Sequence, residues 1–387
     1  MDFALTEEQQ LIIRTTRSFV RQELVPHERE VEDTGVVRTE LLRQLKDKAI
    51  AAGLYAANMP SEVGGAGLDA VSWVLYEKEL GHTSYALQYS CVARPSNILL
   101  ACTGEQRERY LLPAVRGERV ECLAMTEPQA GSDLRSMKTS ALLQGGDFII
   151  NGSKHFISHA DHADFVILFA ASGEEDSARG KRKLITAFLV DKGTPGFAVR
   201  PGYRNVSHRG YTNSILEFTD CRLPKSAVLG EVHRGFEVAN TWLGATRLQV
   251  AANCLGRAER ALEAARQWAV DRVQFGQQIG KFQGVSFKLA DMAVELRAAE
   301  LLTLEAAWKL EHKQATDSDM AIAKLKATEM LAMVADEALQ IHGGMGLMSE
   351  LPLERIWRDA RIERIWEGTS EVQRHIISRA LLRPLGG

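Results

Sequence analysis

Cysteine is scarce in this chain and follows no pattern. The five cysteines among 387 residues are odd in number, widely scattered and without a Cys-x-x-Cys pair: Cys91, Cys102, Cys122, Cys221 and Cys254. Disulfide frameworks and zinc sites depend on paired or regularly spaced cysteines, so neither class of protein is supported. Single scattered cysteines are typical of small buried side chains in a reducing compartment. We therefore expect a cytoplasmic protein of bacterial type, with no targeting segment.

Long apolar runs and an excess of one charge are also lacking. No stretch of about 20 uncharged apolar residues suggests a membrane span, and no apolar run at the N-terminus suggests a signal peptide. The 47 basic and 50 acidic side chains give a formal net charge of -3. Nothing in this balance favours binding to nucleic acid or to an anionic membrane surface. The expected partners are small molecules or proteins.

Several nucleotide- and metal-binding motifs are missing. No G-x-G-x-x-G follows a predicted strand, and neither G-x-x-x-x-G-K-[ST] nor H-E-x-x-H occurs. A dinucleotide-binding Rossmann fold therefore has no support. Three histidines, His155, His159 and His162, stand close together in the sequence, but no carboxylate or cysteine lies at a ligand spacing from them. We expect no metal site.

The sequence does contain three regions of different texture. Residues 1–120 carry apolar positions at helical spacing and predict an N-terminal helical domain. Residues 121–231 contain short apolar runs bounded by glycine, proline and charged residues, which predict a middle β domain. Residues 232–387 return to long amphipathic stretches and predict a C-terminal four-helix bundle.

Two local predictions concern the middle region. Asn151-Gly152 lies between two apolar runs, a pattern typical of a two-residue hairpin turn. The acidic-then-basic run GEEDSARGKRK at 173–183 is interpreted as a solvated loop between strands.

The segment RIWEGTSEVQR at 364–374 places a carboxylate, Glu367, between Trp366 and Gly368. Thr369 and Ser370 begin a helix by capping chemistry, which leaves Glu367 just outside it. A carboxylate beside an indole loses hydration, so its pKa rises and it becomes a better proton acceptor near neutral pH. The alternative is an ordinary solvated loop glutamate.

Three further segments have the chemistry of a ligand site. The stretch AMTEPQAGSDLRSMKT at 124–139 offers hydroxyls and glycine amides that can surround a heterocycle or a phosphate, and the alternative is a plain turn. The stretch VDRVQFGQQIGKFQG at 270–284 places an arginine and a phenylalanine at a helix end, where they could hold a pyrophosphate and stack on a ring. The alternative is a simple helix cap with a surface arginine. The paired glycines of QIHGGMG at 340–346 permit close backbone approach, or merely stop a helix.

Taken in order, the segments ALTEEQQ, TEPQAGSD, VDRVQFGQQIGKFQ, LQIHGGMG and IWEGTSEVQR resemble the acyl-CoA dehydrogenase family of flavoproteins over essentially the whole chain. The resemblance implies a mostly α fold with a central β-barrel-like domain, bound FAD and a homotetramer built as a dimer of dimers. It also implies oxidation of an acyl-CoA to the trans-2-enoyl-CoA, with an electron-transfer flavoprotein as acceptor. The alternatives are an acyl-CoA oxidase of the same fold and a non-catalytic acyl-CoA-binding scaffold.

The resemblance also assigns residues. It implies that Glu367 removes the α-proton while a hydride passes to flavin N5. Substrate contacts would come from Ser132, Arg247, Trp366 and Gly368. Flavin contacts within one subunit would come from Leu123, Met125, Thr126, Gly131, Ser132, Phe156, Ser158, Thr369 and Glu371. The adjacent subunit would add Arg272, Gln274, Phe275, Ile279, Gln340 and Gly344.

Some positions depart from the family pattern. Phe156 and Ser158 stand where tryptophan and threonine are usual, and both keep the aromatic face and the hydroxyl. Glu371 replaces a common glutamine, and Gly244 replaces an aspartate that often precedes the arginine. Thr246 is not acidic, so Glu367 is the only matched base.

The acyl group is less well specified. The resemblance places the floor of the acyl pocket near Thr83, Ser84 and Leu87. Arg94, inside an otherwise apolar segment, either meets a polar acyl group or pairs at a helix interface, and the second interpretation is favoured.

Overall fold

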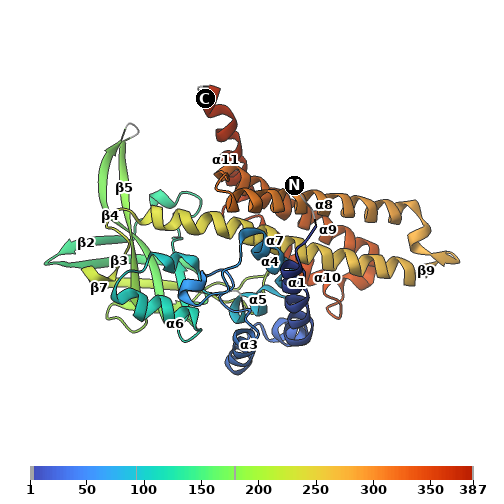
Figure 1. The fold of residues 1–387 in the computed structure, drawn as a ribbon, viewed down its shortest axis with the longest axis horizontal. Coiled ribbons are helices and arrows are strands. Elements are labelled where there is room, and N and C mark those ends of the chain that lie inside the picture. The colour runs from blue at the N-terminus through green and yellow to red at the C-terminus, as the bar shows by residue number, and fades with distance from the viewer. Residues whose placement is uncertain (1–3, 93, 178–179, 386–387) are drawn as a thin grey trace.

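The computed structural model describes residues 4–92, 94–177 and 180–385. Along the chain, a β region lies between two helical regions, as the sequence predicts. In space, the β region lies at one end of the elongated molecule (Figure 1). Among the described residues, no helix combines the length and the apolar character that crossing a membrane requires.

The N-terminal region is built of short helices. α1 starts with the expected capping box, in which the Thr6 hydroxyl accepts a bond from the Gln9 backbone at 3.1 Å. α4 packs against α1 and also against the long helices of the C-terminal region, so it lies between two parts of the fold. The helices are α1 Glu7–Phe19, α2 Glu28–Thr34, α3 Thr39–Ala51, α4 Ala70–Leu80, α5 Tyr85–Cys91 and α6 Leu112–Val115.

The middle region is one sheet with the strand order β6-β7-β3-β2-β4-β5-β8, and β1 pairs with β4 in parallel. Alternate residues of β4 face two different cores. Phe165 and Ile167 pack with the N-terminal helices, whereas Val166 and Leu168 pack inside the β region. The strands are β1 Glu121–Ala124, β2 Ser140–Gln144, β3 Asp147–Ser158, β4 Phe165–Ser177, β5 Gly180–Asp191, β6 Phe197–Pro201, β7 Asn213–Pro224 and β8 Val228–Leu229.

The hairpin predicted at Asn151-Gly152 is wrong. β3 runs straight through these residues, and the turn between β2 and β3 is Gly145-Gly146, with φ of 61° and 96°. Two successive positive φ values suit a two-residue turn that matches the strand twist. Gly152, with φ of 144°, instead marks an irregularity in the pairing with β7. A Cβ at Gly152 would lie 2.6 Å from the Cα of Thr139, so glycine is needed for close packing.

The loop predicted at 173–183 is also wrong, because the segment continues β4 and β5 as a projecting two-stranded ribbon (Figure 1). Acidic residues of one strand face basic residues of the other, and Glu175 and Arg182 form an ion pair at 3.0 Å. Opposite charges directly across a strand pair stabilise it. Residues 178–179 of this run lie outside the described residues.

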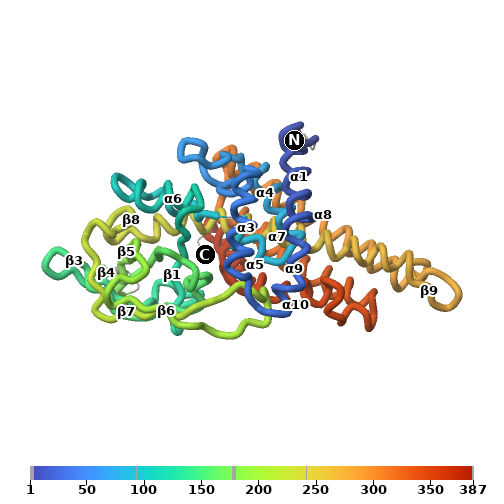
Figure 2. The backbone as a smooth tube through the Cα atoms, turned by 90° about the horizontal axis from the view of Figure 1, so that it is seen from below, coloured from blue at the N-terminus to red at the C-terminus, as the bar shows by residue number. Residues whose placement is uncertain are grey.

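The C-terminal region is dominated by long helices that lie side by side. Buried alanines, including Ala258 and Ala327, allow α7 and α9 to approach closely. The short hairpin β9–β10 projects from the end of the molecule opposite the β region (Figures 1 and 2). The elements are α7 Gly235–Asp271, β9 Val273–Gln274, β10 Gln277–Gln278, α8 Gln283–Glu311, α9 Asp317–His342, α10 Leu353–Glu363 and α11 Ser370–Leu382.

Candidate active site

Glu367 lies in the tight turn between α10 and α11. Its φ is 52°, and Gly368 follows with φ of 89°. A left-handed glutamate is uncommon and is held only where surrounding contacts fix it. On the α11 side, the Thr369 hydroxyl caps the helix by accepting a bond from the Val372 backbone at 3.2 Å, as the sequence predicts for this helix start.

A buried lysine holds this turn. The Lys324 ammonium, on α9, donates to the carbonyl oxygens of Glu363 at 2.7 Å, Trp366 at 3.1 Å and Gly368 at 2.9 Å. Gln373 adds a bond from its amide to the Glu367 carbonyl at 3.2 Å. These contacts set the direction of the Glu367 side chain through its own backbone.

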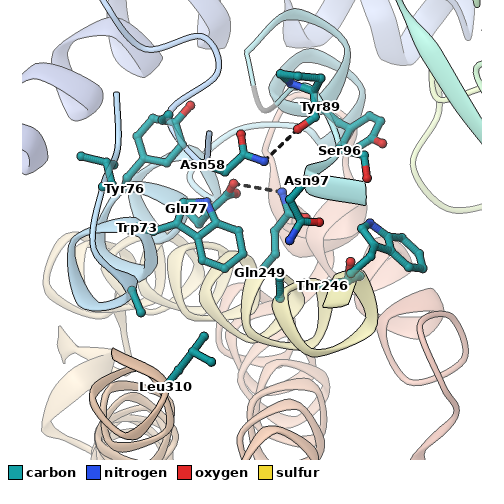
Figure 3. Close-up of a pocket in the computed structure, with 16 residues that line it drawn as sticks. Asn58, Trp73, Tyr76, Glu77, Tyr89, Ser96, Asn97, Thr246, Gln249 and Leu310 are labelled. Carbon is teal, nitrogen blue, oxygen red and sulfur yellow. Dashed lines mark hydrogen bonds between the residues drawn. The ribbon is translucent and has the colours of Figure 1, made fainter. Parts of the chain in front are cut away.

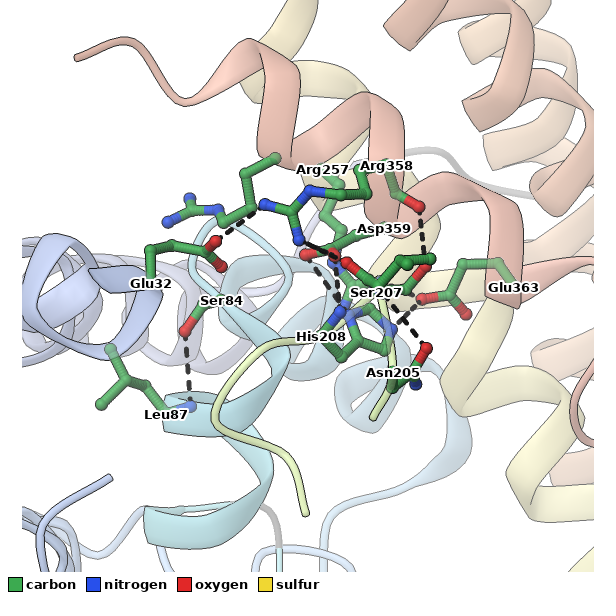
Figure 4. A network of polar contacts seen from close by, with 12 residues as sticks. Glu32, Ser84, Leu87, Asn205, Ser207, His208, Arg257, Arg358, Asp359 and Glu363 are labelled. Atoms are coloured by element: carbon green, nitrogen blue, oxygen red, sulfur yellow. Dashed lines mark hydrogen bonds and ion pairs between the residues drawn. The ribbon is translucent and has the colours of Figure 1, made fainter. Parts of the chain in front are cut away.

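Behind the turn lies a buried network of charges (Figure 4). The Glu363 carboxylate accepts bonds from His208 Nε2 at 3.0 Å, from Trp366 Nε1 at 2.7 Å and from Arg257. Burial alone would raise the pKa of Glu363, but Arg257 and His208 outweigh it and the net shift is downward. Glu363 therefore stays ionised and anchors the indole next to Glu367.

The Glu367 carboxylate itself is free. Within the described residues it makes no hydrogen bond or ion pair, and the backbone N–H of Glu367 likewise has no acceptor. Burial raises the pKa of Glu367 to about 7, while the positive charges of Lys324 and Arg247 oppose the shift. The raised pKa predicted from the sequence is confirmed.

Arg247 lies on α7 with its charge mostly enclosed. Its nearest acidic partner, Asp317, is 3.7 Å away, and Arg247 Nε is buried without a hydrogen-bond acceptor among the described residues. An incompletely satisfied guanidinium near a free carboxylate is suited to contact a ligand.

A cavity of about 210 Å³ lies between α4, α7 and residues 95–97 (Figure 3). Its walls include Trp73, Glu77, Tyr89, Thr246 and Gln249. Tyr89, in this lining, lies close enough to Glu367 to interact with its charge, and Thr246 precedes Arg247 on α7.

The pocket floor predicted at Thr83, Ser84 and Leu87 is not part of this cavity. The Thr83 hydroxyl and the Ser84 backbone N–H donate to Glu28 Oε1 at 2.9 Å and 3.1 Å. Leu87 is fully buried. Which side chains face the cavity depends on how the helices pack in space, and this could not be inferred from the positions of these residues in the sequence.

Arg94 also does not enter the cavity lining. It is buried against Glu121 at 3.2 Å, and its guanidinium lies 4.7 Å from the centre of the Tyr89 ring. This agrees with the interpretation of Arg94 as a residue paired at an interface.

The junction loop between β1 and β2 is fixed by a second buried ion pair. Lys154 donates to Glu127 at 2.8 Å and to the Met125 carbonyl at 2.9 Å. The backbone of His155 donates to the Thr126 carbonyl at 2.9 Å, which joins the loop to β3. The structure therefore brings the predicted residues of the loop and of β3 together.

The residues of the junction loop and of β3 suit a planar heterocycle. Gly131 has open space where a Cβ would stand, and Phe156, with φ of 57°, exposes 59% of its surface. Hydroxyls of Thr126, Ser132 and Ser158 supply uncharged donors. The FAD expected from the sequence fits this donor set.

The second predicted set lies far from the first. Arg272, Gln274, Phe275 and Ile279 belong to the projecting β9–β10 end, opposite the β region (Figures 1 and 2). Gln340 and Gly344 lie at the same end, since Trp268 of α7 stacks on His342 with ring centres 5.0 Å apart. Phe275 is 94% exposed. One chain does not bring the two sets together.

Sequence reasoning missed Lys324, Glu363, Lys154 and Glu77, all fully or almost fully buried. A signal existed for Lys324, because its neighbours Ala321 and Ala327 show that it lies on the buried stripe of α9. No cluster of His, Cys, Asp and Glu suited to a metal ion occurs in the described part of the chain.

A helical, a β and a helical region in this order, with a free buried carboxylate between α10 and α11, match what the resemblance to acyl-CoA dehydrogenases implies. Family models match residues 6–118, 122–221 and 233–382, as the N-terminal, middle and C-terminal domains of acyl-CoA dehydrogenase. The chain belongs to the acyl-CoA dehydrogenase family and is an oxidoreductase.

Individual relatives agree along the full length. A probable acyl-CoA dehydrogenase of Bacillus subtilis, YngJ, is 36% identical over 99% of this chain and 100% of its own. Butyryl-CoA dehydrogenase from Megasphaera elsdenii has a TM-score of 0.90 and 35% identity, covering 99% of this chain and 100% of that one. The FAD complex of PigA has a TM-score of 0.90 and 30% identity, with both chains fully covered.

Proposed function

We propose that this chain catalyses the FAD-dependent α,β-dehydrogenation of an acyl-CoA thioester to the trans-2-enoyl-CoA, with Glu367 as the base. The observation that carries the assignment is the state of Glu367. Its carboxylate has no partner among the described residues, and its pKa is raised to about 7. A base poised near neutral pH both accepts a proton readily and is present in its ionised form.

The backbone N–H of Glu367 can stabilise the negative charge that forms during proton removal. Removing an α-proton places negative charge on the thioester oxygen, and a fixed donor at that oxygen lowers the barrier. The Glu367 N–H lacks an acceptor in the described part of the chain, so it is available for this role. Lys324 fixes its direction through the carbonyls on either side.

Glu77 is a second buried carboxyl with a pKa raised to about 7 by burial. It differs from Glu367 because three side-chain amides, of Gln88, Gln249 and Asn253, already donate to it. A carboxylate held in this way is a poorer proton acceptor, which favours Glu367 as the base.

FAD, when bound, would supply the acceptor for the β-hydride. We infer that its isoalloxazine end is held by Leu123, Met125, Thr126, Gly131, Ser132, Phe156, Ser158, Thr369 and Glu371. Ser132, Arg247, Trp366 and Gly368 would contact the thioester. A neighbouring subunit would add Arg272, Gln274, Phe275, Ile279, Gln340 and Gly344, because these residues lie at the far end of their own chain.

This shared site requires at least a dimer, and we propose a homotetramer as a dimer of dimers. The exposed aromatic and aliphatic residues of the projecting end, Val273, Phe275 and Phe287, support burial against another copy. An electron-transfer flavoprotein is the proposed acceptor. A cytoplasmic location is supported by the five cysteines, all of which are buried free thiols.

The test is anaerobic mixing of the purified holoenzyme with butyryl-CoA, following loss of the flavin absorbance. Wild type should bleach, and Glu367→Gln should keep its flavin but bleach at least about 1,000-fold more slowly. Glu311→Gln, at the exposed end of α8, is the matched control. A Glu367→Gln rate close to wild type would remove the assignment. Peroxide formed under air would indicate an oxidase instead.

A further inference from the structure

The cavity beside Thr246 has several polar groups in its wall. Its lining includes Glu77, the amides of Asn58, Asn97 and Gln249, and the hydroxyl of Thr246. Within the described residues, no lysine, arginine or histidine lines it. Ligand pockets are usually lined mainly by apolar side chains, and a few polar groups in the wall fix the orientation and identity of the ligand. Most of this lining is apolar, so its carboxylate is the group that bears on the identity of the occupant.

Glu77 is the unusual feature of the lining. It belongs to α4 and lines the cavity, and only 2% of its surface is exposed. Burying a carboxyl group is costly unless other groups bond to it. Here Gln249 donates to Oε1 at 2.9 Å, and Asn253 and Gln88 donate to Oε2 at 2.9 Å and 3.3 Å.

These bonds leave room for one more donor. Oε2 accepts two amides, whereas Oε1 accepts one, and Figure 3 shows the Glu77 carboxylate joined to the Gln249 amide by a hydrogen bond. The neighbouring Trp73 indole N–H lowers the pKa of Glu77 but makes no hydrogen bond among the described residues. A carboxylate oxygen can accept about two bonds, so Oε1 has an unfilled position. The side-chain amides of α5 and α7 thus hold the Glu77 carboxylate in place as a hydrogen-bond acceptor.

We propose that this cavity receives the distal end of the acyl group, and that Glu77 selects an uncharged acyl group bearing a hydroxyl or N–H there while rejecting a terminal carboxylate. The inference rests on the proposed function and names its substrate class.

Three physical effects separate the candidate substrates. A hydroxyl can donate to Glu77 and accept from Gln249 or Asn97. A terminal methyl leaves these polar groups dehydrated and unpaired, which disfavours binding. Above about pH 7, where Glu77 is mostly ionised, a terminal carboxylate places a second negative group beside it with no cation in the described lining to balance it.

The experiment compares the holoenzyme on three thioesters of equal chain length: pentanoyl-CoA, 5-hydroxypentanoyl-CoA and glutaryl-CoA. The ratio of kcat/KM values is measured by anaerobic flavin reduction. Wild type should prefer 5-hydroxypentanoyl-CoA over pentanoyl-CoA by about tenfold or more. Glutaryl-CoA should be slower than both by about 100-fold.

Two variants identify the residue responsible. Glu77→Gln keeps the shape and removes the negative charge, so its activity on glutaryl-CoA should rise by about tenfold or more relative to pentanoyl-CoA. Glu79→Gln is the matched control, because Glu79 lies two residues along α4 and pairs with Arg17 at 2.6 Å, outside the cavity lining. Its ratios should equal those of wild type.

If the wild type prefers pentanoyl-CoA, or oxidises glutaryl-CoA readily, the proposal is overturned. This outcome needs only wild-type data and does not depend on whether a variant folds. Unchanged ratios in a folded, flavin-loaded Glu77→Gln would overturn the role of Glu77. Butyryl-CoA separates the two levels of the argument. If no thioester, butyryl-CoA included, reduces the flavin, the proposed function itself fails.

Discussion

The Lys324 ammonium lies 2.9 Å from the carbonyl oxygen of Gly368, the residue that follows Glu367. The same ammonium bonds to the carbonyl of Trp366, which precedes Glu367. One buried cation on α9 therefore holds the turn from both sides. It also acts on the charge of Glu367, since burial raises the pKa of Glu367 and Lys324 partly offsets that rise.

Replacing Lys324 by methionine should remove both effects. With the positive charge gone, the pKa of Glu367 should rise above about 7, so the acid limb of the kcat/KM profile should move upward by about one pH unit. The profile is measured from pH 5.5 to 9.5 with butyryl-CoA. Lys326→Met is the control, because Lys326 lies on the same helix but pairs with Glu295. If kcat falls but the pH profile of kcat/KM does not shift, Lys324 has only a structural role and does not tune the pKa of Glu367.

The raised pKa of Glu367 also predicts a cost in stability. The folded-state pKa of about 7 exceeds the ordinary value of 4.5, so between these pH values the folded state holds a proton that the unfolded state releases. Stability is therefore lost as pH rises through this window. Glu367→Gln avoids the cost and should be more stable than wild type at pH 8, by roughly 1 to 3 kcal/mol.

Melting of the flavin-loaded protein at pH 8 and at pH 5 checks this. The gain should be clear at pH 8 and small at pH 5, because Glu367 is then protonated in the folded state. Glu311→Gln should show no such pH dependence. A Glu367→Gln protein that is less stable than wild type at pH 8 would contradict the electrostatic account.

The fold was predictable where the sequence carries a regular pattern over many residues. Helical spacing extends through α7, α8 and α9, and the segment order is that of the family, so the helical, β and helical arrangement is confirmed. Local turns were less predictable. Asn151-Gly152 and Gly145-Gly146 are both acceptable two-residue turns, and only the pairing of β3 with β7 decides between them.

The site was predictable only in part. Glu367 is marked by its neighbours in sequence, Trp366 and Gly368. Lys324 is more than 40 residues away. Its alanine neighbours place it on the buried stripe of α9, but the sequence does not show that it packs against the turn of Glu367, because burial of a charge depends on what packs over it. Glu77 is hidden for the same reason, since its amide partners lie on α5 and α7. The domain boundaries at 120 and 231 stay predictions.

The buried pair of Lys154 and Glu127 predicts how the junction loop is kept in place. Both side chains are enclosed, with 0% and 1% exposure. Lys154→Met would leave the Glu127 carboxylate buried without its cation, a change that typically costs about 3 to 5 kcal/mol. The loop that carries Gly131 and Ser132 should loosen, so we expect lower melting temperature and loss of flavin on gel filtration.

Lys181→Met serves as the control for this change. Lys181 pairs with Glu174 at 3.6 Å on the exposed ribbon, and its loss should leave flavin content and melting temperature unaltered. A Lys154→Met protein with a full complement of flavin would show that the loop does not depend on the pair.

The distance between the two sets of flavin residues predicts complementation between defective subunits. Glu367→Gln lacks the base, and Arg272→Ala should lose flavin because its guanidinium no longer reaches the phosphates of the neighbouring site. In a hybrid dimer, one site would combine Glu367 of the Arg272→Ala chain with Arg272 of the Glu367→Gln chain. That site is intact, so each mixed dimer of the proposed tetramer should have one active site of two, and a purified hybrid should be active at up to about half of its sites. The two chains are co-expressed with different tags, isolated by successive affinity steps and assayed by flavin bleaching with butyryl-CoA. If each site were built from one chain, every site in the hybrid would carry a defect and the hybrid would be inactive.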